Sequence, residues 1–212
     1  MGGSRPLLRR CCRAIAAPRA VGIVPGVSEQ GSTATHFGAT LWLTGLSAAG
    51  KTTVARAIEG RLAELGRAAL VLDGDVLRKG LSSDLGLSPE DRSEHARRVA
   101  HVAALLAASG LVAIVALISP YLEDRRRARE VHDSDGLPFY EIWIDTPLAV
   151  CIERDPKGLY RRARAGELSG VTGIDAPYEP PADPELRIDA HKESPQAGAE
   201  RVVAILAGVA VH

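Results

Sequence analysis

Short apolar runs alternate with amphipathic segments along the chain from Thr40 onward. Apolar runs bounded by turn residues predict strands, here at residues 40–44, 68–72, 111–118, 139–145 and 186–189. The run at 111–118 has no polar interruption, which is typical of a central parallel strand that is covered on both faces. The run at 186–189 is expected to be an edge or final strand.

The segments between these runs carry apolar residues with helical spacing. One side of the helix predicted over residues 51–65 carries Val54, Ile58, Leu62 and Leu65. The other predicted helices cover residues 89–109, 121–131, 147–154 and 195–209. Residues 155–184 are rich in Gly, Pro and charge and show no periodicity. The alternation of strands and helices predicts an α/β fold with a mainly parallel sheet and right-handed crossovers.

The first 35 residues have a different composition. Five arginines precede the first acid, Glu29, and Gly, Pro, Ser and Thr crowd residues 22–35. A basic, acid-poor segment is typical of an organellar transit peptide, and the alternative is a disordered arm or an over-extended start. We therefore divide the chain into an N-terminal arm, residues 1–35, and one domain, residues 36–212.

Composition narrows the class of protein. The chain has 212 residues, of which 46% are hydrophobic and 25% charged, and 26 basic residues balance 26 acids. A net charge of zero excludes the electrostatic footprint of a nucleic-acid or membrane-surface binder. Cys11, Cys12 and Cys151 form neither a metal-binding spacing nor a disulfide framework. We expect a reducing compartment: the cytoplasm, or a plastid or other organelle if the arm is a transit peptide.

A glycine-rich segment between the first strand and the first helix fits G-x-x-x-x-G-K-[ST] without a mismatch. The backbone N–H groups of such a loop wrap the β-phosphate of a nucleotide, helped by the positive end of the following helix. Lys51 would spread charge over the β- and γ-oxygens, and Thr52 would supply a hydroxyl to Mg²⁺. The ATP-binding residues predicted here are Gly45, Leu46, Ser47, Ala48, Ala49, Gly50, Lys51, Thr52 and Thr53.

Two acids follow the second predicted strand. Asp73 and Asp75 end the run at 68–72. Ligands of open α/β sheets collect outside the carboxyl ends of the strands, so both acids should face the γ-phosphate. One carboxylate can hold Mg²⁺ through water and one can accept the proton of an attacking hydroxyl. The bland alternative is an Asp-Gly turn with solvated acids.

Several separated motifs resemble those of the adenylylsulfate kinases, which make the sulfate donor PAPS from adenosine 5′-phosphosulfate (APS). They are GLSAAGKTT (45–53), LDGDVLRKGL (72–81), DLGLS (84–88), EDRSEHARR (90–98), ALISPYLEDR (116–125), DTPLAV (145–150), ERDPKGLYRRARAG (153–166) and TGIDAPYE (172–179). The resemblance covers residues 37–189. It implies a three-layer α/β/α P-loop kinase fold with a mobile lid, Mg²⁺ with ATP as cofactor, and a homodimer.

The resemblance also implies roles for individual residues. Asp73 would be the catalytic base and, with Thr52, a metal ligand, and Asp75 would belong to the same network. A serine at the position of Ser119 is often described in this family as a phosphorylated intermediate, although direct in-line transfer to a hydroxyl needs no covalent relay. The substrate-binding set would comprise Asp75, Arg78, Leu87, Arg92, His95, Ile118, Ser119, Lys157 and Val171. In this set the two arginines would grip the phosphosulfate.

The lid implied by the resemblance runs from Lys157 to about Gly173, and its basic side chains would close over ATP and exclude water. Besides Ala48, which stands where the family usually has Gly, three positions depart from the family pattern. Leu87 and Val171 stand where the family usually has Phe, and those rings are thought to sandwich the adenine of APS. His95 replaces an Asn that normally lies near the substrate.

Three hypotheses therefore follow from the sequence. The first is ATP-dependent phosphorylation of the 3′-hydroxyl of APS, with ATP sulfurylase as a separate pathway partner. The second keeps the chemistry and changes the acceptor to another nucleotide, and it rests on the three departures. The third is a weakly active nucleotide-binding module that regulates a sulfate-activating partner.

Overall fold

The computed structural model describes residues 38–208, so the expectations for the arm at residues 1–35 lie outside the described residues. A five-stranded sheet has the order β2-β3-β1-β4-β5, and every pairing in it is parallel. Its strands are β1 (Ala39–Thr44), β2 (Ala69–Asp73), β3 (Val112–Ala116), β4 (Phe139–Ile144) and β5 (Leu186–Ile188). This confirms the predicted parallel α/β architecture and the edge position of the last strand.

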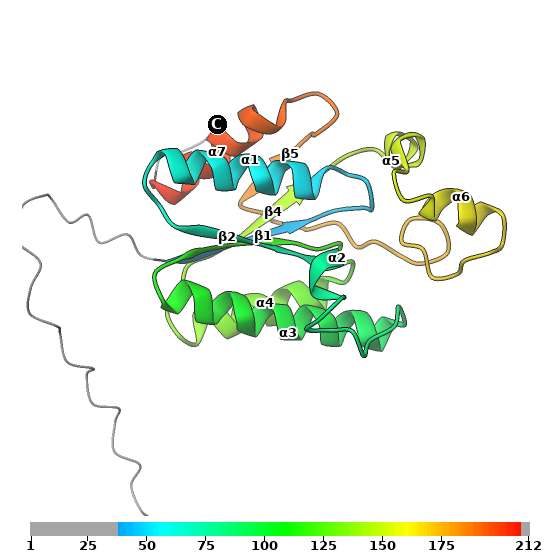
Figure 1. Cartoon of the computed structure of the whole chain (residues 1–212), viewed down its shortest axis with the longest axis horizontal. Helices are drawn as coiled ribbons and strands as arrows, with labels where there is room; N and C mark the ends of the chain where they lie inside the picture. Colours follow the sequence, from blue (N-terminus) through cyan, green and yellow to red (C-terminus); the bar gives the residue numbers. More distant parts are fainter. Residues whose placement is uncertain (1–37, 209–212) are drawn as a thin grey trace, which may run out of the picture. The chain divides into compact units, whose positions relative to one another are not determined.

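Helices cover both faces of the sheet (Figure 1). One face carries α1 (Lys51–Glu64) and α7 (Pro195–Leu206), and the other carries α3 (Pro89–Ala108) and α4 (Leu122–Asp133). Three short helices lie beyond the carboxyl ends of the strands: α2 (Gly74–Leu77), α5 (Leu148–Arg154) and α6 (Leu159–Arg164). The domain is therefore the three-layer α/β/α fold expected from the sequence.

The central strand β1 shows why the sheet is covered on both sides. Leu41 and Leu43 belong to the apolar cluster under α1 and α7, whereas Trp42 belongs to the cluster under α3. All three side chains are fully buried. Successive side chains of a strand point to opposite faces, so an unbroken apolar run fills two cores at once.

The two edges of the sheet are constructed differently. On the edge strand β2, the backbone N–H of Val71 donates a hydrogen bond to Glu59 Oε1 of α1 at 3.2 Å. The opposite edge strand, β5, has only three residues. The Glu59 side chain thus pairs with a backbone N–H group of β2 that would otherwise lack a partner at the edge of the sheet.

Most predicted elements are confirmed with shifts of one to a few residues at their ends. Two helices were not predicted. Helix α2 begins where the sequence indicated a break after the second strand, and α6 lies in the segment without periodicity. Within residues 38–208, no helix combines the length and apolar character needed to cross a membrane.

Candidate active site

The glycine-rich loop links the carboxyl end of β1 to the first turn of α1. Gly45 has φ 149°, and a Cβ at this position would lie 2.5 Å from the carbonyl oxygen of Ile144. Gly50 precedes α1 with φ 108°, and no side chain caps this helix. The N–H groups of the first turn are therefore not occupied by a capping side chain, which suits an anion. Ala48 also has a left-handed φ, 58°, which explains why glycine is usual there.

Lys51 lies inside this loop. Its ammonium group donates hydrogen bonds to the carbonyl oxygens of Gly45 at 2.9 Å and Leu46 at 2.6 Å. Burial lowers the pKa of Lys51 to about 8, because desolvation disfavours the charged form. The charge is thus enclosed by the loop whose N–H groups would bind phosphate.

Thr52, in the first turn of α1, is in direct contact with Asp73, at the carboxyl end of β2. Thr52 Oγ1 donates to Asp73 Oδ2 at 2.7 Å. The other oxygen, Asp73 Oδ1, accepts from the backbone N–H groups of Asp75 at 2.9 Å and Val76 at 3.4 Å, and so caps α2. A hydroxyl beside a carboxylate is a ligand pair that Mg²⁺ accepts. No group of three or more His, Cys, Asp or Glu side chains suited to a metal occurs among residues 38–208.

One cleft of about 800 Å³ lies beside the loop. Its volume falls in the range of about 300–1,000 Å³ typical of small-molecule sites. It is lined by every predicted substrate-binding residue, namely Asp75, Arg78, Leu87, Arg92, His95, Ile118, Ser119, Lys157 and Val171. It also contains Lys51, Thr52 and Asp73, whereas Gly45, Leu46 and Ala49 of the loop do not line it. The structure therefore brings the predicted nucleotide and acceptor residues into one space.

The two predicted phosphosulfate-binding arginines donate to backbone carbonyls. Arg78 donates to the carbonyl oxygen of Gly86 at 2.8 Å. Arg92 donates to the carbonyl oxygens of Leu87 at 2.9 Å and Gly170 at 2.5 Å, and to Thr172 Oγ1 at 3.0 Å. Arg92 therefore joins the start of α3 to the end of the predicted lid.

His95 lies in α3 and is 4% exposed. Its Nδ1 is 2.8 Å from Ser82 Oγ, while its Nε2 is buried without a hydrogen-bond partner among residues 38–208. Burial and the nearby guanidinium groups of Arg78 and Arg98 lower the pKa of His95 to about 4. The imidazole is thus neutral at pH 7, and its Nε2 atom is buried beside the cleft that the residue lines.

Ser119 is held by its surroundings rather than activated. Trp42 Nε1 donates to Ser119 Oγ at 3.1 Å, and the residue has φ 37°. The Ser119 carbonyl accepts from Arg125 at 2.6 Å and from Thr44 at 3.4 Å. An indole N–H cannot take the proton of a hydroxyl, so this contact gives Ser119 no general base.

The predicted lid contacts the cleft at both of its ends. Lys157 forms an ion pair with Asp75 of α2, and Tyr160 Oη donates to the carbonyl oxygen of Ser47 at 3.0 Å. Near its other end, Val171 is 6% exposed and packs into the core under α1. Leu87, by contrast, is 47% exposed. Leu87 and Val171, which stand where aromatic rings were expected, therefore differ in the free space around their side chains.

Arg154, for which no role was predicted from the sequence, also lines the cleft. Its guanidinium donates to the carbonyl oxygens of Ala49 at 3.4 Å and Ala190 at 3.0 Å. It thus joins α5 to the phosphate loop and to the segment after β5. The available signal was its position just before DPKG in a motif already noted.

Comparisons with known proteins agree with this geometry. The sequence profile described as Adenylylsulphate kinase matches residues 37–189. An "Adenylyl-sulfate kinase" of Paraburkholderia xenovorans is 52% identical over 80% of this chain and 93% of its own length. A "Bifunctional enzyme CysN/CysC" of Mycobacterium tuberculosis is 54% identical over 71% of this chain, a match that covers 25% of that protein. The solved structure of the M. tuberculosis "APS kinase CysC in complex with AMPPNP and APS" is 50% identical, with a TM-score of 0.78 over 80% of this chain and 98% of that one.

Proposed function

This chain belongs to the adenylylsulphate kinase family, and from that premise we infer that it transfers the γ-phosphate of ATP to the 3′-hydroxyl of APS. The products are PAPS and ADP. The observation that carries this conclusion is the single cleft that joins the phosphate loop to all of the acceptor residues carried over from the family motifs. The similar solved structure was obtained with a nucleotide analogue and APS bound.

The loop and α1 provide the nucleotide half of the site. The N–H groups after Gly45 surround the β-phosphate, and Lys51 exchanges its two carbonyl partners for phosphate oxygens. Mg²⁺, when bound, neutralises charge between the β- and γ-phosphates. Thr52 and Asp73 are the side chains of this chain that would hold it, directly or through water.

Asp73 provides the acceptor chemistry. The 3′-oxygen of the acceptor forms a bond to the γ-phosphorus while the bond from that phosphorus to the ADP oxygen breaks. The proton of the hydroxyl passes to Asp73, whose Oδ2 faces the loop through Thr52. Ser119 takes no part in covalent transfer and shapes the backbone beside the acceptor.

His95 contributes a hydrogen-bond donor to the acceptor pocket. Ser82 Oγ has His95 Nδ1 as its side-chain partner, and its hydroxyl proton is satisfied if it donates to that nitrogen. The proton of the neutral ring then resides on Nε2, the atom without a partner. Because Nε2 is buried, this donor meets an oxygen of the acceptor nucleotide only if the surrounding wall of the cleft opens on binding, and it would then replace the amide of the more usual Asn.

The wider assignment follows from the chemistry. APS must be supplied by a reaction that joins ATP and sulfate, so ATP sulfurylase is the proposed separate partner. We propose a homodimer, as the family resemblance implies, and a cytoplasmic location, which the similarity to bacterial relatives such as that of P. xenovorans supports. A molar mass from light scattering would test the dimer.

A coupled ADP-release assay tests the function. ADP release should depend on APS and should be weak with other nucleotides or with no acceptor. A parent protein that ignores APS but phosphorylates another nucleotide would show that the acceptor is wrong. ADP release that no acceptor stimulates would favour a regulatory nucleotide-binding module.

Lys51→Ala is the matching loss-of-function variant. Removing a positioned charge from the transferring phosphoryl group should reduce the rate roughly a hundredfold or more. The initial rate at saturating ATP is measured together with a thermal melt, because the fold should persist. A rate within about tenfold of the parent, a loss of only 1.4 kcal/mol, would contradict the assignment of the loop.

A further inference from the structure

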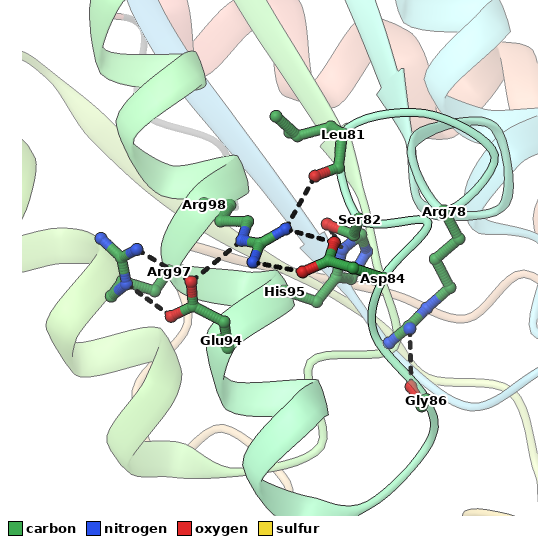
Figure 2. A network of polar contacts seen from close by, with 9 residues as sticks. All are labelled: Arg78, Leu81, Ser82, Asp84, Gly86, Glu94, His95, Arg97 and Arg98. Atoms are coloured by element: carbon green, nitrogen blue, oxygen red, sulfur yellow. Dashed lines mark hydrogen bonds and ion pairs between the residues drawn. The ribbon is translucent and has the colours of Figure 1, made fainter.

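The segment between α2 and α3 forms one wall of the acceptor side of the cleft. We call residues 78–87 the acceptor loop. Its two ends, Arg78 and Leu87, both line the cleft. Between them the chain forms hydrogen-bonded turns and no regular helix or strand, and side-chain contacts join these turns to α3. Figure 2 shows Arg98 and His95 of α3 beside this loop, and a contact between Arg78 and Gly86 within the loop itself.

Arg98 makes most of these contacts. Its guanidinium forms a two-pronged pair with the Asp84 carboxylate, with distances of 2.6 Å from Nη1 to Oδ1 and 2.8 Å from Nη2 to Oδ2. Nη1 also donates to the carbonyl oxygen of Leu81 at 2.9 Å, and Nε donates to Glu94 Oε1 at 2.9 Å (Figure 2). One side chain of α3 thus binds the backbone and a side chain of the acceptor loop.

An isolated exposed ion pair contributes only about 0–1 kcal/mol to the stability of a fold, so the charge of Arg98 alone would not give it a role. The geometry of its contact with Asp84 distinguishes Arg98 from an isolated surface arginine. A planar guanidinium with two parallel bonds to a carboxylate fixes both distance and direction, which a lysine ammonium does not. His95, three residues earlier, adds a second connection through Ser82 at 2.8 Å.

We propose that Arg98 is a positioning residue for the acceptor: it holds the acceptor loop so that Arg78 and Leu87 stand at the acceptor side of the cleft. The proposal rests on the proposed function, since it concerns APS as the acceptor. Arg98 and its partners Leu81, Asp84 and Glu94 do not line the cleft. Arg98 therefore acts through the loop and not by touching a substrate.

The effect should be specific to the acceptor. ATP binds to residues 45–53, which follow β1, whereas the acceptor loop follows α2. Within residues 38–208, Arg98 forms hydrogen bonds to Leu81, Asp84 and Glu94, and none to the phosphate loop. Loosening the acceptor loop should therefore weaken APS binding and leave ATP binding unchanged.

The test compares Arg98→Lys with Arg97→Lys. Arg97 lies one residue earlier in α3 and also pairs with Glu94, at 2.6 Å and 2.9 Å, but makes no contact with the acceptor loop. Both variants keep the positive charge and lose a planar contact to Glu94. Only Arg98→Lys should raise the KM for APS, by roughly tenfold or more, because a misplacement of about 1 Å can cost a hundredfold. The KM for ATP should stay within about twofold in both variants.

Equal effects of the two variants, or an equal rise in both KM values for Arg98→Lys, would overturn the proposal. Asp84→Asn approaches the same contact from the exposed loop and guards against a folding defect in the helix. It should raise the KM for APS in the same direction, and the double variant should lose less than the sum of the two. A normal KM for APS in Asp84→Asn and a strictly additive double variant would each contradict the proposal.

Amide hydrogen exchange separates this proposal from the proposed function. Without any substrate, Arg98→Lys should speed exchange in residues 79–87 relative to Arg97→Lys. If the parent does not phosphorylate APS but this difference is seen, the function fails and the positioning role stands. If APS is phosphorylated and exchange is the same in both variants, the positioning role fails alone.

Discussion

The two oxygens of the Asp73 carboxylate have different partners, and this allows a test of its chemistry without loss of its structural role. Oδ1 caps α2 and Oδ2 accepts from Thr52. In Asp73→Asn the amide oxygen can keep the cap, and the amide nitrogen can donate to the threonine hydroxyl. We expect kcat to fall roughly 10²–10⁴-fold, the contribution of a general base, with little change in ATP affinity.

The measurement for Asp73→Asn is steady-state turnover together with a nucleotide titration. A thermal melt close to that of the parent serves as the control for α2. Near-normal turnover would move the base to Asp75 or remove the need for one.

Leu87 and Val171 differ in the space around them, so the same aromatic substitution should have opposite effects. Leu87 is 47% exposed at the cleft, and Leu87→Phe should stack on the base of APS, a contact worth about 1–3 kcal/mol. Val171 is 6% exposed within the core, and Val171→Phe should destabilise the fold by about 1–3 kcal/mol through overpacking.

Titration calorimetry with APS, with ADP and Mg²⁺ present, measures the first effect, and urea unfolding measures the second. A tenfold or greater fall in the Kd of Leu87→Phe corresponds to about 1.4 kcal/mol. No gain for Leu87→Phe would mean that the aliphatic side chain already suffices.

At the scale of whole elements, a few contacts join the lid to α2, to α3 and to the phosphate loop. Lys157 pairs with Asp75, and this contact joins the segment after α5 to α2. Lys157→Met should remove it, admit water to the nucleotide and raise acceptor-independent ADP release relative to the APS-dependent rate several-fold. Lys192→Met, which removes an exposed lysine paired with Asp189, is the matched control.

Both lysine variants are measured by ADP release with and without APS. An unchanged ratio in Lys157→Met would show that this ion pair does not control access of water. A rise in both variants would indicate a general loss of charge and not an effect of the lid.

The long elements were predictable because their periodicity extends over many residues. The helix expected at residues 89–109 is observed as α3 (Pro89–Ala108), with Ser88 as its cap. Helices α2 and α6 have four and six residues, too few for a periodic pattern, and they depend on Asp73 as a cap and on Gly158 at φ 64°.

The parts of the candidate site also differ in whether they could be predicted from the sequence. The phosphate loop was predictable because its function depends on adjacent residues, and the backbone conformation of the loop restricts which residue types can occur there. The contact between Arg98 and Asp84 spans 14 positions and exists only because the acceptor loop folds back on α3. The contact of Arg92 with the lid backbone could not be predicted for the same reason, because its partner Gly170 lies 78 positions away.

At the scale of the whole domain, two buried histidines should make stability depend on pH. His132 is fully buried between Thr40 Oγ1 at 2.8 Å and the Ala128 carbonyl at 2.7 Å, and burial lowers its pKa. The pKa of His95 is lowered to about 4. Below pH 6.5 the unfolded chain binds protons that the folded chain does not, so stability should fall between about pH 6.5 and 4.

His95 contributes up to about 1.4 kcal/mol per pH unit within this window, and His132 lowers stability in the same direction. Urea unfolding at pH 7.5, 6 and 5 measures the slope, and His95→Asn should flatten it. His101→Asn is the control, because His101 is exposed on the same helix. Equal slopes for parent and His95→Asn would show that the histidine is protonated in the folded state.

The edges of the sheet constrain how copies of the chain can assemble. A strand from a second copy could extend the sheet only by using the outward N–H and C=O groups of β2 or β5. On β2 the donor of Val71 is already used by Glu59, and β5 offers just three residues. Self-association should therefore proceed through helical faces, which leaves the carboxyl ends of all five strands, and the cleft beside them, unobstructed by a shared sheet.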